Sequence, residues 1–173
     1  ASDNDRITQI EYLLDDEVVL TRTSDWGMTN IDTTQVAEGI HTIQVRAKDG
    51  NHNTALSAVH QFTVDHTAPR VELIDPVAAT NADQVSFLMA FPDDDVHNSY
   101  CTIRKQGDDT PFPDSYNDEQ YCWDDAPYGK EGLDEGVWEF VVEANDIVDN
   151  KTRIVHEFVV DRTAPAIEFD SGP

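Results

Sequence analysis

The 173-residue chain contains few basic residues: 11 Lys and Arg stand against 35 Asp and Glu, which gives a formal net charge of −24 at pH 7. Nucleic acids and anionic lipids repel a polyanion, so binding to nucleic acid or to a membrane surface is excluded. The chain also lacks any apolar run near the roughly 18 residues that a transmembrane helix needs. An acidic surface of this kind attracts divalent cations instead.

Sequence signatures of catalysis are missing too. No Gly-x-Ser-x-Gly, no His-Glu-x-x-His and no glycine-rich phosphate loop is present. Carboxylates are so common in this chain that a pair of them marks no active site. Among the histidines, His60 and His156 hold the same position in an internal repeat, which favours packing or surface roles. The sequence therefore predicts a protein that is not an enzyme.

Helical patterns are absent, and strand patterns take their place. Val85, Phe87, Met89 and Phe91 occupy every second position, as in a strand with one buried face. Such runs are short and are separated by turns rich in Asp, Asn, Gly and Pro, such as "KDGNHN" and "DAPYG". The pattern predicts an all-β protein. Strands are expected at residues 7–14, 70–74, 84–91, 99–105, 110–112, 120–123, 137–144 and 154–161.

One sequence pattern occurs twice, about 100 residues apart. "EGIHTIQVRAKD" begins at residue 38 and "EGVWEFVVEAND" at residue 135, while "HQFTVDHTAP" begins at 60 and "HEFVVDRTAP" at 156. This period suits small all-β sandwiches in tandem, and about seven strands in the second copy fit an immunoglobulin-like sandwich. We expect an immunoglobulin-like domain at 1–67, a second at 68–162, and the first strand of a following domain, or a linker, at 163–173.

The first copy is shorter than the second. Only six residues precede its first expected strand, at 7–14, whereas two strands precede the equivalent strand of the second copy, at 99–105. The first domain is therefore expected to be truncated at its N-terminus or to take its missing strands from elsewhere. The expected strand within 163–169 has no partner in its own repeat.

The second copy resembles the bacterial immunoglobulin-like repeats of large secreted adhesins and surface proteins. The resemblance rests on "YCTIRKQGDD", "QYCWDDAPY", "GLDEGVWEF", "VVEANDIVDN" and "HEFVVDRTAP", and "ASDNDRITQIEYLLDDEVV" is similar to the middle of such a repeat. It implies tandem immunoglobulin-like β-sandwich domains in a secreted or cell-surface protein. Two departures are Asp149-Asn150, where the family usually has Gly-Asn, and Trp138, where a His is common.

The only two cysteines, Cys101 and Cys122, each lie next to an aromatic residue. A redox pair usually comes as Cys-x-x-Cys, and a zinc site would need two further ligands at short spacing. The family pattern supports a disulfide between neighbouring strands. Such a bond stabilises by roughly 3 kcal/mol and implies an oxidising compartment.

Acidic residues gather at turns and at the junction between the copies. Calcium takes six to eight oxygen ligands, and extracellular modules bind it with a Kd of about 10⁻⁴–10⁻³ M. The expected ligands are Asp49, Asp65, Asp93, Asp94, Asp95, Asp146, Asp149 and Asp161. The alternative is that Asp49 and Asp146 cap their own turns while the other carboxylates are solvated. The sequence leaves both interpretations open.

The segment between the cysteines carries an insertion, "GDDTPFPDSYNDE", at 107–119. Exposed aromatic rings offer large, rigid contact surfaces with a polar edge. A carbohydrate- or protein-binding site is therefore a hypothesis for this region. Its expected residues are Tyr116, Tyr121, Trp123 and Tyr128.

The leading functional interpretation is a non-enzymatic extender or stalk of a bacterial adhesin or surface protein, rigidified by calcium, whose partners are the neighbouring repeats of the same chain. The first alternative is a module that binds a glycan or a host surface protein. A second is a filament subunit that assembles by strand addition, so that the chain is either a monomer or a strand-exchanged filament. An accessory domain of a secreted hydrolase is a further alternative.

Overall fold

A computed structural model describes residues 6–23, 28–108 and 121–168 of the chain. These residues form strands, turns and irregular segments, with no helix that could cross a membrane among them. The chain divides into two compact units, Ala1–His66 and Thr67–Pro173.

The first unit is a single antiparallel sheet. Its strands are β1 (Ile7–Leu14), β2 (Glu17–Arg22), β3 (Gly39–Asp49), β4 (Thr54–Leu56) and β5 (His60–Val64). Their order is β2-β1-β3, and both β4 and β5 pair with the free side of β3. Asp15 and Asp16 close the β1–β2 hairpin with φ angles of 48° and 67°. Two successive positive φ angles are typical of the type I′ turn, which matches the twist of a hairpin.

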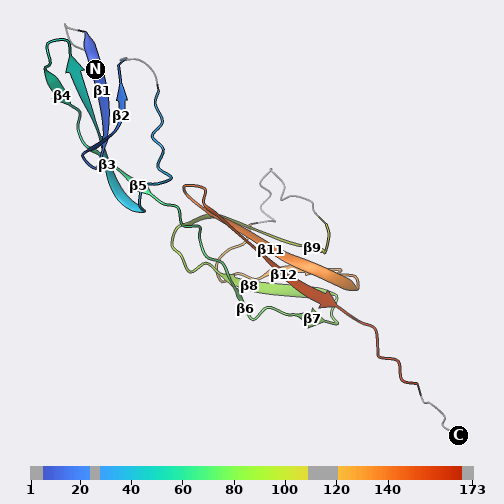
Figure 1. Cartoon of the computed structure of the whole chain (residues 1–173). Helices are drawn as coiled ribbons and strands as arrows, with labels where there is room; N and C mark the ends of the chain where they lie inside the picture. Colours follow the sequence, from blue (N-terminus) through green and yellow to red (C-terminus); the bar gives the residue numbers. More distant parts are fainter. Residues whose placement is uncertain (1–5, 24–27, 109–120, 169–173) are drawn as a thin grey trace. The chain divides into compact units, whose positions relative to one another are not determined.

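The second unit is a sandwich of two sheets. Its strands are β6 (Glu72–Ile74), β7 (Ala79–Thr80), β8 (Gln84–Ala90), β9 (Val96–Lys105), β10 (Tyr128–Glu131), β11 (Gly136–Asp146) and β12 (Lys151–Val160). One sheet has the order β10-β8-β6 and the other β7-β12-β11-β9, and the two layers are visible in Figure 1. The three- and four-stranded sheets reproduce the layout of an immunoglobulin-like sandwich.

Aromatic rings from both sheets fill the core of the second unit. Phe87 on β8 stacks on Phe140 of β11 with ring centroids 4.5 Å apart, and Phe158 on β12 lies 5.2 Å from Phe87. Phe140 is 0 % exposed. These rings come from alternate positions of their strands, so the period-2 pattern of the sequence places them on the inner faces.

Equivalent strands begin with the same residue pairing in the two units. Gly39 pairs with Val64 in the first unit, and Gly136 pairs with Val160 in the second. Both glycines have a positive φ, 127° and 133° respectively, which other residues rarely adopt. The repeated "EG" at 38–39 and 135–136 therefore marks the same strand start in each unit.

Most expected strands are present, with shifted ends, and β1 has the expected bounds. Residues 110–112 lie outside the described residues, and of 120–123 only Tyr121 forms a β-bridge, to Tyr100. The sequence interpretation missed β2, β4, β7 and β10. The expected "DAPYG" turn was wrong at its end, because Tyr128 and Gly129 belong to β10 instead. A Cβ at Gly129 would lie 2.9 Å from the Val85 carbonyl oxygen, so this glycine permits a close strand contact.

Candidate functional site

The carboxylate of Asp146 holds the turn between β11 and β12. Its Oδ1 accepts hydrogen bonds from the backbone N–H groups of Val148 and Asn150, both at 2.9 Å, and its Oδ2 accepts from Asn150 Nδ2 at 2.7 Å. Asp146 is only 1 % exposed. Burial raises the pKa of Asp146, but the hydrogen bonds from Asn150 and Val148 outweigh burial and bring the pKa below its usual value.

Asp49 builds the same turn after β3. Its Oδ1 accepts from the N–H groups of Asn51 and Asn53 at 2.8 and 2.9 Å, and its Oδ2 accepts from Asn53 Nδ2 at 2.8 Å. The fourth residue of each turn, His52 or Asp149, has a φ near 70°. The turn therefore keeps its geometry although Asp149 stands where the family usually has glycine.

The other acidic residues of the expected calcium set are distributed over several places. Asp93 Oδ2 accepts from the Arg70 backbone N–H at 2.6 Å, and Asp93 Oδ1 pairs with the Arg70 guanidinium. Asp161 Oδ1 accepts from the N–H of Thr163 at 2.9 Å. Asp149 pairs with Lys151, and Asp65 follows β5 in the first unit. These contacts assign turn and connector roles to most of the set.

Asp95 and Asp146 are the two members of the set that the second unit brings together. One carboxylate oxygen of each lies within 4.8 Å of the other. Asp146 Oδ1 already accepts two hydrogen bonds, whereas Oδ2 accepts one and keeps a lone pair. The oxygen chemistry thus fits a hard cation, with Asp146 Oδ2 and Asp95 as ligands.

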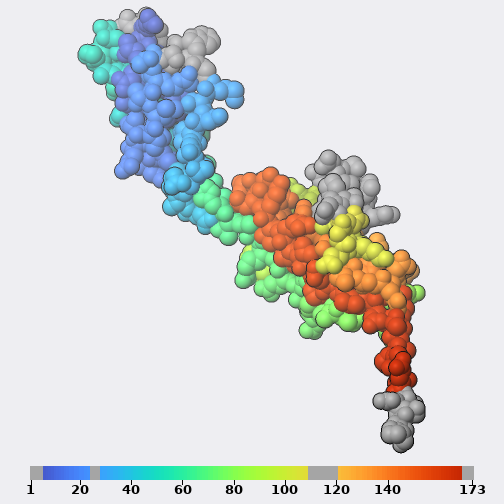
Figure 2. All heavy atoms as spheres, turned by 45° about the vertical axis from the view of Figure 1, so that its right-hand side comes forward, coloured from blue at the N-terminus to red at the C-terminus, as the bar shows by residue number. Residues whose placement is uncertain are grey.

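A glutamate at the start of β3 or β11 holds the segment that leaves each unit. Glu38 Oε1 accepts from the backbone N–H of His66 at 3.1 Å. Glu135 Oε1 accepts from the N–H of Arg162 at 2.8 Å, and Thr163 Oγ1 donates to the same carboxylate. Beyond this point residues 164–168 are exposed and leave the second unit (Figure 2). The repeated "EG" and "VDxTAP" motifs therefore belong to one structural device.

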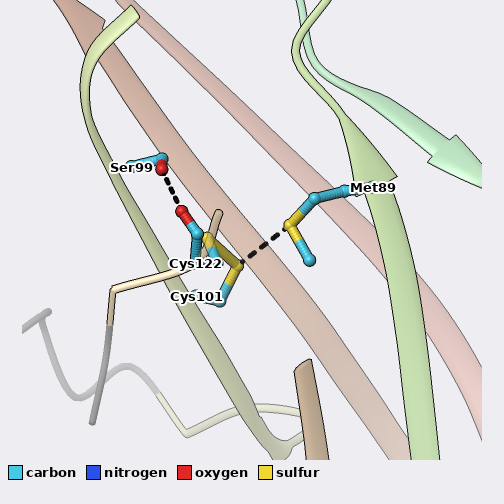
Figure 3. Close-up of a disulfide and its surroundings, with 4 residues drawn as sticks. All are labelled: Met89, Ser99, Cys101 and Cys122. Carbon is cyan, nitrogen blue, oxygen red and sulfur yellow. Dashed lines mark hydrogen bonds between the residues drawn. A yellow bond between two sulfur atoms is a disulfide. The ribbon is translucent and has the colours of Figure 1, made fainter. Parts of the chain in front are cut away.

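The disulfide fixes the segment after the insertion onto β9. Cys101 and Cys122 are bonded, with their Cα atoms 5.7 Å apart, as the family pattern implies. Ser99 Oγ donates to the Cys122 carbonyl, and the Cys122 N–H donates to the Ser99 carbonyl at 3.2 Å. Met89 Sδ lies 3.4 Å from Cys101 Sγ (Figure 3). The bond is part of the sandwich core, so it has a structural role.

Aromatic side chains follow the disulfide in a row. Tyr121 lies 5.0 Å from Tyr100 and 5.8 Å from Trp123 between ring centroids, and the Tyr121 and Trp123 rings are nearly parallel, at 16°. Trp123 is 65 % exposed and lines a hollow of about 280 Å³ that also includes His97 and Asn98. Sequence reasoning missed these two polar residues, which lie on β9 and carry no motif.

The remaining expected binding residues lie elsewhere. Tyr128 packs on Phe140 in the core, with ring centroids 5.9 Å apart, and does not line the hollow. Tyr116 and residues 109–119 of the insertion lie outside the described residues. Within the described part of the chain, only Tyr121 and Trp123 of the four expected residues are brought together.

His41 and Trp138 are equivalent residues that make the same backbone contact. His41 Nε2 lies 2.8 Å from the Ala37 carbonyl oxygen, and Trp138 Nε1 donates to the Asp134 carbonyl at 2.9 Å. His41 Nδ1 also lies 2.6 Å from Asp15 Oδ2. This hydrogen bond raises the pKa of His41 and lowers the pKa of Asp15.

Comparison with known proteins supports an immunoglobulin-like fold. Residues 25–92 match the family model of the bacterial Ig-like domain (group 3), which covers less than half of the chain. No curated protein sequence matches this chain. With the sandwich topology of the second unit, this match confirms the prediction of an all-β, immunoglobulin-like sandwich.

Two solved structures are similar at low sequence identity. The fibronectin(III)-like modules of Clostridium thermocellum CbhA are 18 % identical with a TM-score of 0.49, covering 98 % of this chain and 87 % of theirs. The central fibronectin-III array of RIM-binding protein is 12 % identical with a TM-score of 0.30, covering 95 % and 61 %. Both TM-scores are below 0.5, so no statement about this chain depends on them.

Proposed function

We propose that the chain is a non-enzymatic extender segment of a secreted or cell-surface bacterial protein, such as an adhesin, in which immunoglobulin-like units repeat in tandem. The observation that carries this proposal is the connector device present in both units. In each, the glutamate directly before β3 or β11 accepts a hydrogen bond from the backbone N–H of the residue that precedes Thr-Ala-Pro. The proline fixes its own φ and restricts the residue before it. The chain therefore leaves each sheet in a defined direction, as a spacer requires.

Force spectroscopy on the whole chain tests the mechanical part of this proposal. The second unit is expected to give a distinct unfolding peak, because β11 pairs with β12 along ten residues and with β9 along nine. Reduction of the disulfide should lengthen the released chain by roughly 70 Å, since 21 residues separate the cysteines. An unfolding trace without a resolvable peak would contradict the spacer role. Antibody labelling of intact producing cells tests the surface location.

Calcium is proposed as a rigidifying ligand of this spacer, held by Asp95 and Asp146 Oδ2. Its support is the proximity of these two carboxylates and the excess of acidic residues over basic ones. Thermal melts with calcium, with magnesium and with chelator test this idea. The Tm should rise in calcium and Asp95→Asn should reduce the rise, whereas equal Tm values in calcium and chelator would remove calcium from the account.

A strand-exchanged filament is a second candidate. Ile167 is 80 % exposed, and the Thr-Ala-Pro segment before it is the second copy of the sequence that leads into β6. In the second unit, however, β6 pairs with β8, and a donated strand would need such a partner in the receiving sheet. Size-exclusion chromatography over a wide concentration range decides, because a filament must grow with concentration and a monomer does not.

A further inference from the structure

The hollow beside the disulfide combines an exposed aromatic surface with hydrogen-bonding groups. Trp123 is a large apolar side chain that is 65 % exposed, although the backbone around it is firmly held. Around the hollow stand Asp94, His97 and Asn98, together with Tyr121. Flat aromatic surface next to convergent polar groups is the usual composition of a small-molecule site.

The segment that carries Trp123 is fixed to both sheets of the sandwich. On one side, the disulfide and the Tyr100–Tyr121 bridge hold it to β9. On the other side, Asp124 Oδ1 accepts from the Phe91 N–H at 2.8 Å, and the Asp125 N–H donates to the Met89 carbonyl at 3.2 Å. A site held in this way loses little conformational entropy when a ligand binds. The disulfide and these hydrogen bonds therefore hold the backbone in a position that leaves the indole exposed.

The arrangement of the rings decides which ligand suits the hollow. Cation-binding sites surround the charge with several aromatic faces, whereas Tyr121 and Trp123 are nearly parallel, at 16°. Because the two rings are stacked on each other, a ligand meets one flat ring face, which matches the apolar face of a pyranose ring. Asp94 has no hydrogen-bond or ion-pair partner among the described residues, so its oxygens are available to sugar hydroxyl groups.

Charge then narrows the class of sugar. Asp93, Asp94 and Asp124 all line the hollow, and no Lys or Arg does among the described residues. Sialic acids, uronic acids and sulfated sugars carry a negative charge that these carboxylates repel. We propose that this hollow binds a neutral sugar ring, stacked on Trp123 and hydrogen-bonded to Asp94 and Asn98. The proposal goes beyond the extender role and does not depend on it.

A glycan array followed by calorimetry tests the proposal on the whole chain. The array carries neutral glycans next to sialylated and sulfated ones, and calorimetry uses soluble neutral manno-, cello- and chito-oligosaccharides. We expect neutral glycans alone to bind. Trp123→Ala should weaken binding about tenfold or more, in line with the loss of an aromatic contact of about 1.4 kcal/mol. Trp123→Phe should retain part of the affinity, and Asp94→Asn should weaken it less than Trp123→Ala does.

Controls separate the site from the fold. Ile147→Ser changes an apolar residue that is even more exposed than Trp123 and does not line the hollow, and it should leave affinity unchanged. Thermal melts should show that Trp123→Ala remains folded, because its side chain is mostly exposed. The proposal is overturned if neutral oligosaccharides fail to bind at millimolar concentration, if only acidic glycans bind, if tetramethylammonium binds instead, or if Trp123→Ala binds as tightly as the parent chain.

Discussion

The two units have an equivalent set of paired strands, β1, β3 and β5 in the first unit and β9, β11 and β12 in the second. The units differ in what covers these strands. In the second unit β6, β8 and β10 form a layer over β11, so Phe140 and Val142 are fully buried. Their equivalents in the first unit, Ile43 and Val45, are half-buried. The Asp turn, the strand-start glycine and the Glu-held connector are nevertheless the same in both. The local hydrogen bonds of this repeat therefore form without a second sheet, whereas full burial of the inner side chains requires one.

The largest expected difference between the units concerns their cores. Phe140→Ala should cost the second unit about 3–5 kcal/mol, because a buried ring is replaced by a cavity. Ile43→Ala should cost the first unit clearly less, since part of that side chain is already exposed. Urea titrations followed by NMR signals from each unit measure the two losses. Equal losses would mean that the inner face of the first unit is covered as completely as that of the second.

Reduction of the disulfide is the next largest effect. It should destabilise the second unit by roughly 3 kcal/mol, because the unfolded chain gains the freedom of the opened loop. The first unit has no cysteine and should keep its stability. Amide hydrogen exchange with and without reductant measures both units in one sample. A matching loss of protection in the first unit would show that the two units do not unfold independently.

Removal of the carboxylates of Asp49 and Asp146 tests whether the stability of their turns depends on the second sheet, β10-β8-β6. Asp49→Ala and Asp146→Ala each leave backbone N–H groups without their acceptor, at a cost of about 2 kcal/mol. Similar losses are expected, because the two turns have the same hydrogen bonds. The lowered pKa of Asp146 adds a pH test. Its contribution is present above the usual Asp value and is lost as pH falls through the lowered pKa.

The comparison of the units also shows what the sequence can predict. The period-2 pattern predicted the main strands, because the alternation of buried and exposed residues is set by neighbours in the chain. The repeat and the number of strands predicted the sandwich. The sequence left open whether Asp49 and Asp146 cap turns or bind calcium, because a carboxylate suits both roles. The structure shows the turn contacts in atomic detail. Calcium binding stays a prediction.

For the hollow, in contrast to the turns, the sequence predicted only part of the set of residues. Tyr121 and Trp123 were expected to belong to a binding site because aromatic residues follow Cys122. His97 and Asn98 reach the same hollow from β9, and Asp94 from the turn before it. These contacts depend on how the chain crosses between sheets. Residue types and local spacing do not predict such contacts, and for the same reason they do not predict that Tyr128 packs on Phe140 instead of lining the hollow.

A pH titration should affect the first unit more than the second above neutrality. The hydrogen bond to Asp15 raises the pKa of His41, so its contribution is complete below 6.5 and is lost as pH rises through the raised pKa. Trp138 takes the same place in the second unit and does not titrate. Stability curves from pH 6 to 9, read separately for each unit, measure this difference. His41→Trp should abolish the pH dependence, and its persistence in that variant would assign it to another group.

The smallest expected effect concerns the left-handed residue of each turn. His52 and Asp149 have φ angles of 71° and 72°, a conformation that glycine adopts without strain. His52→Gly should stabilise the first unit by about 0.5–1 kcal/mol. Asp149→Gly should gain less, since the short polar side chain of Asp suits this conformation and the exposed ion pair with Lys151 is lost. Denaturant midpoints of the two variants compare the gains directly. A larger gain for Asp149→Gly would mean that the second turn is more strained than the first, although both turns have the same hydrogen bonds. The apolar Ile147-Val148 pair would then be the source of that strain.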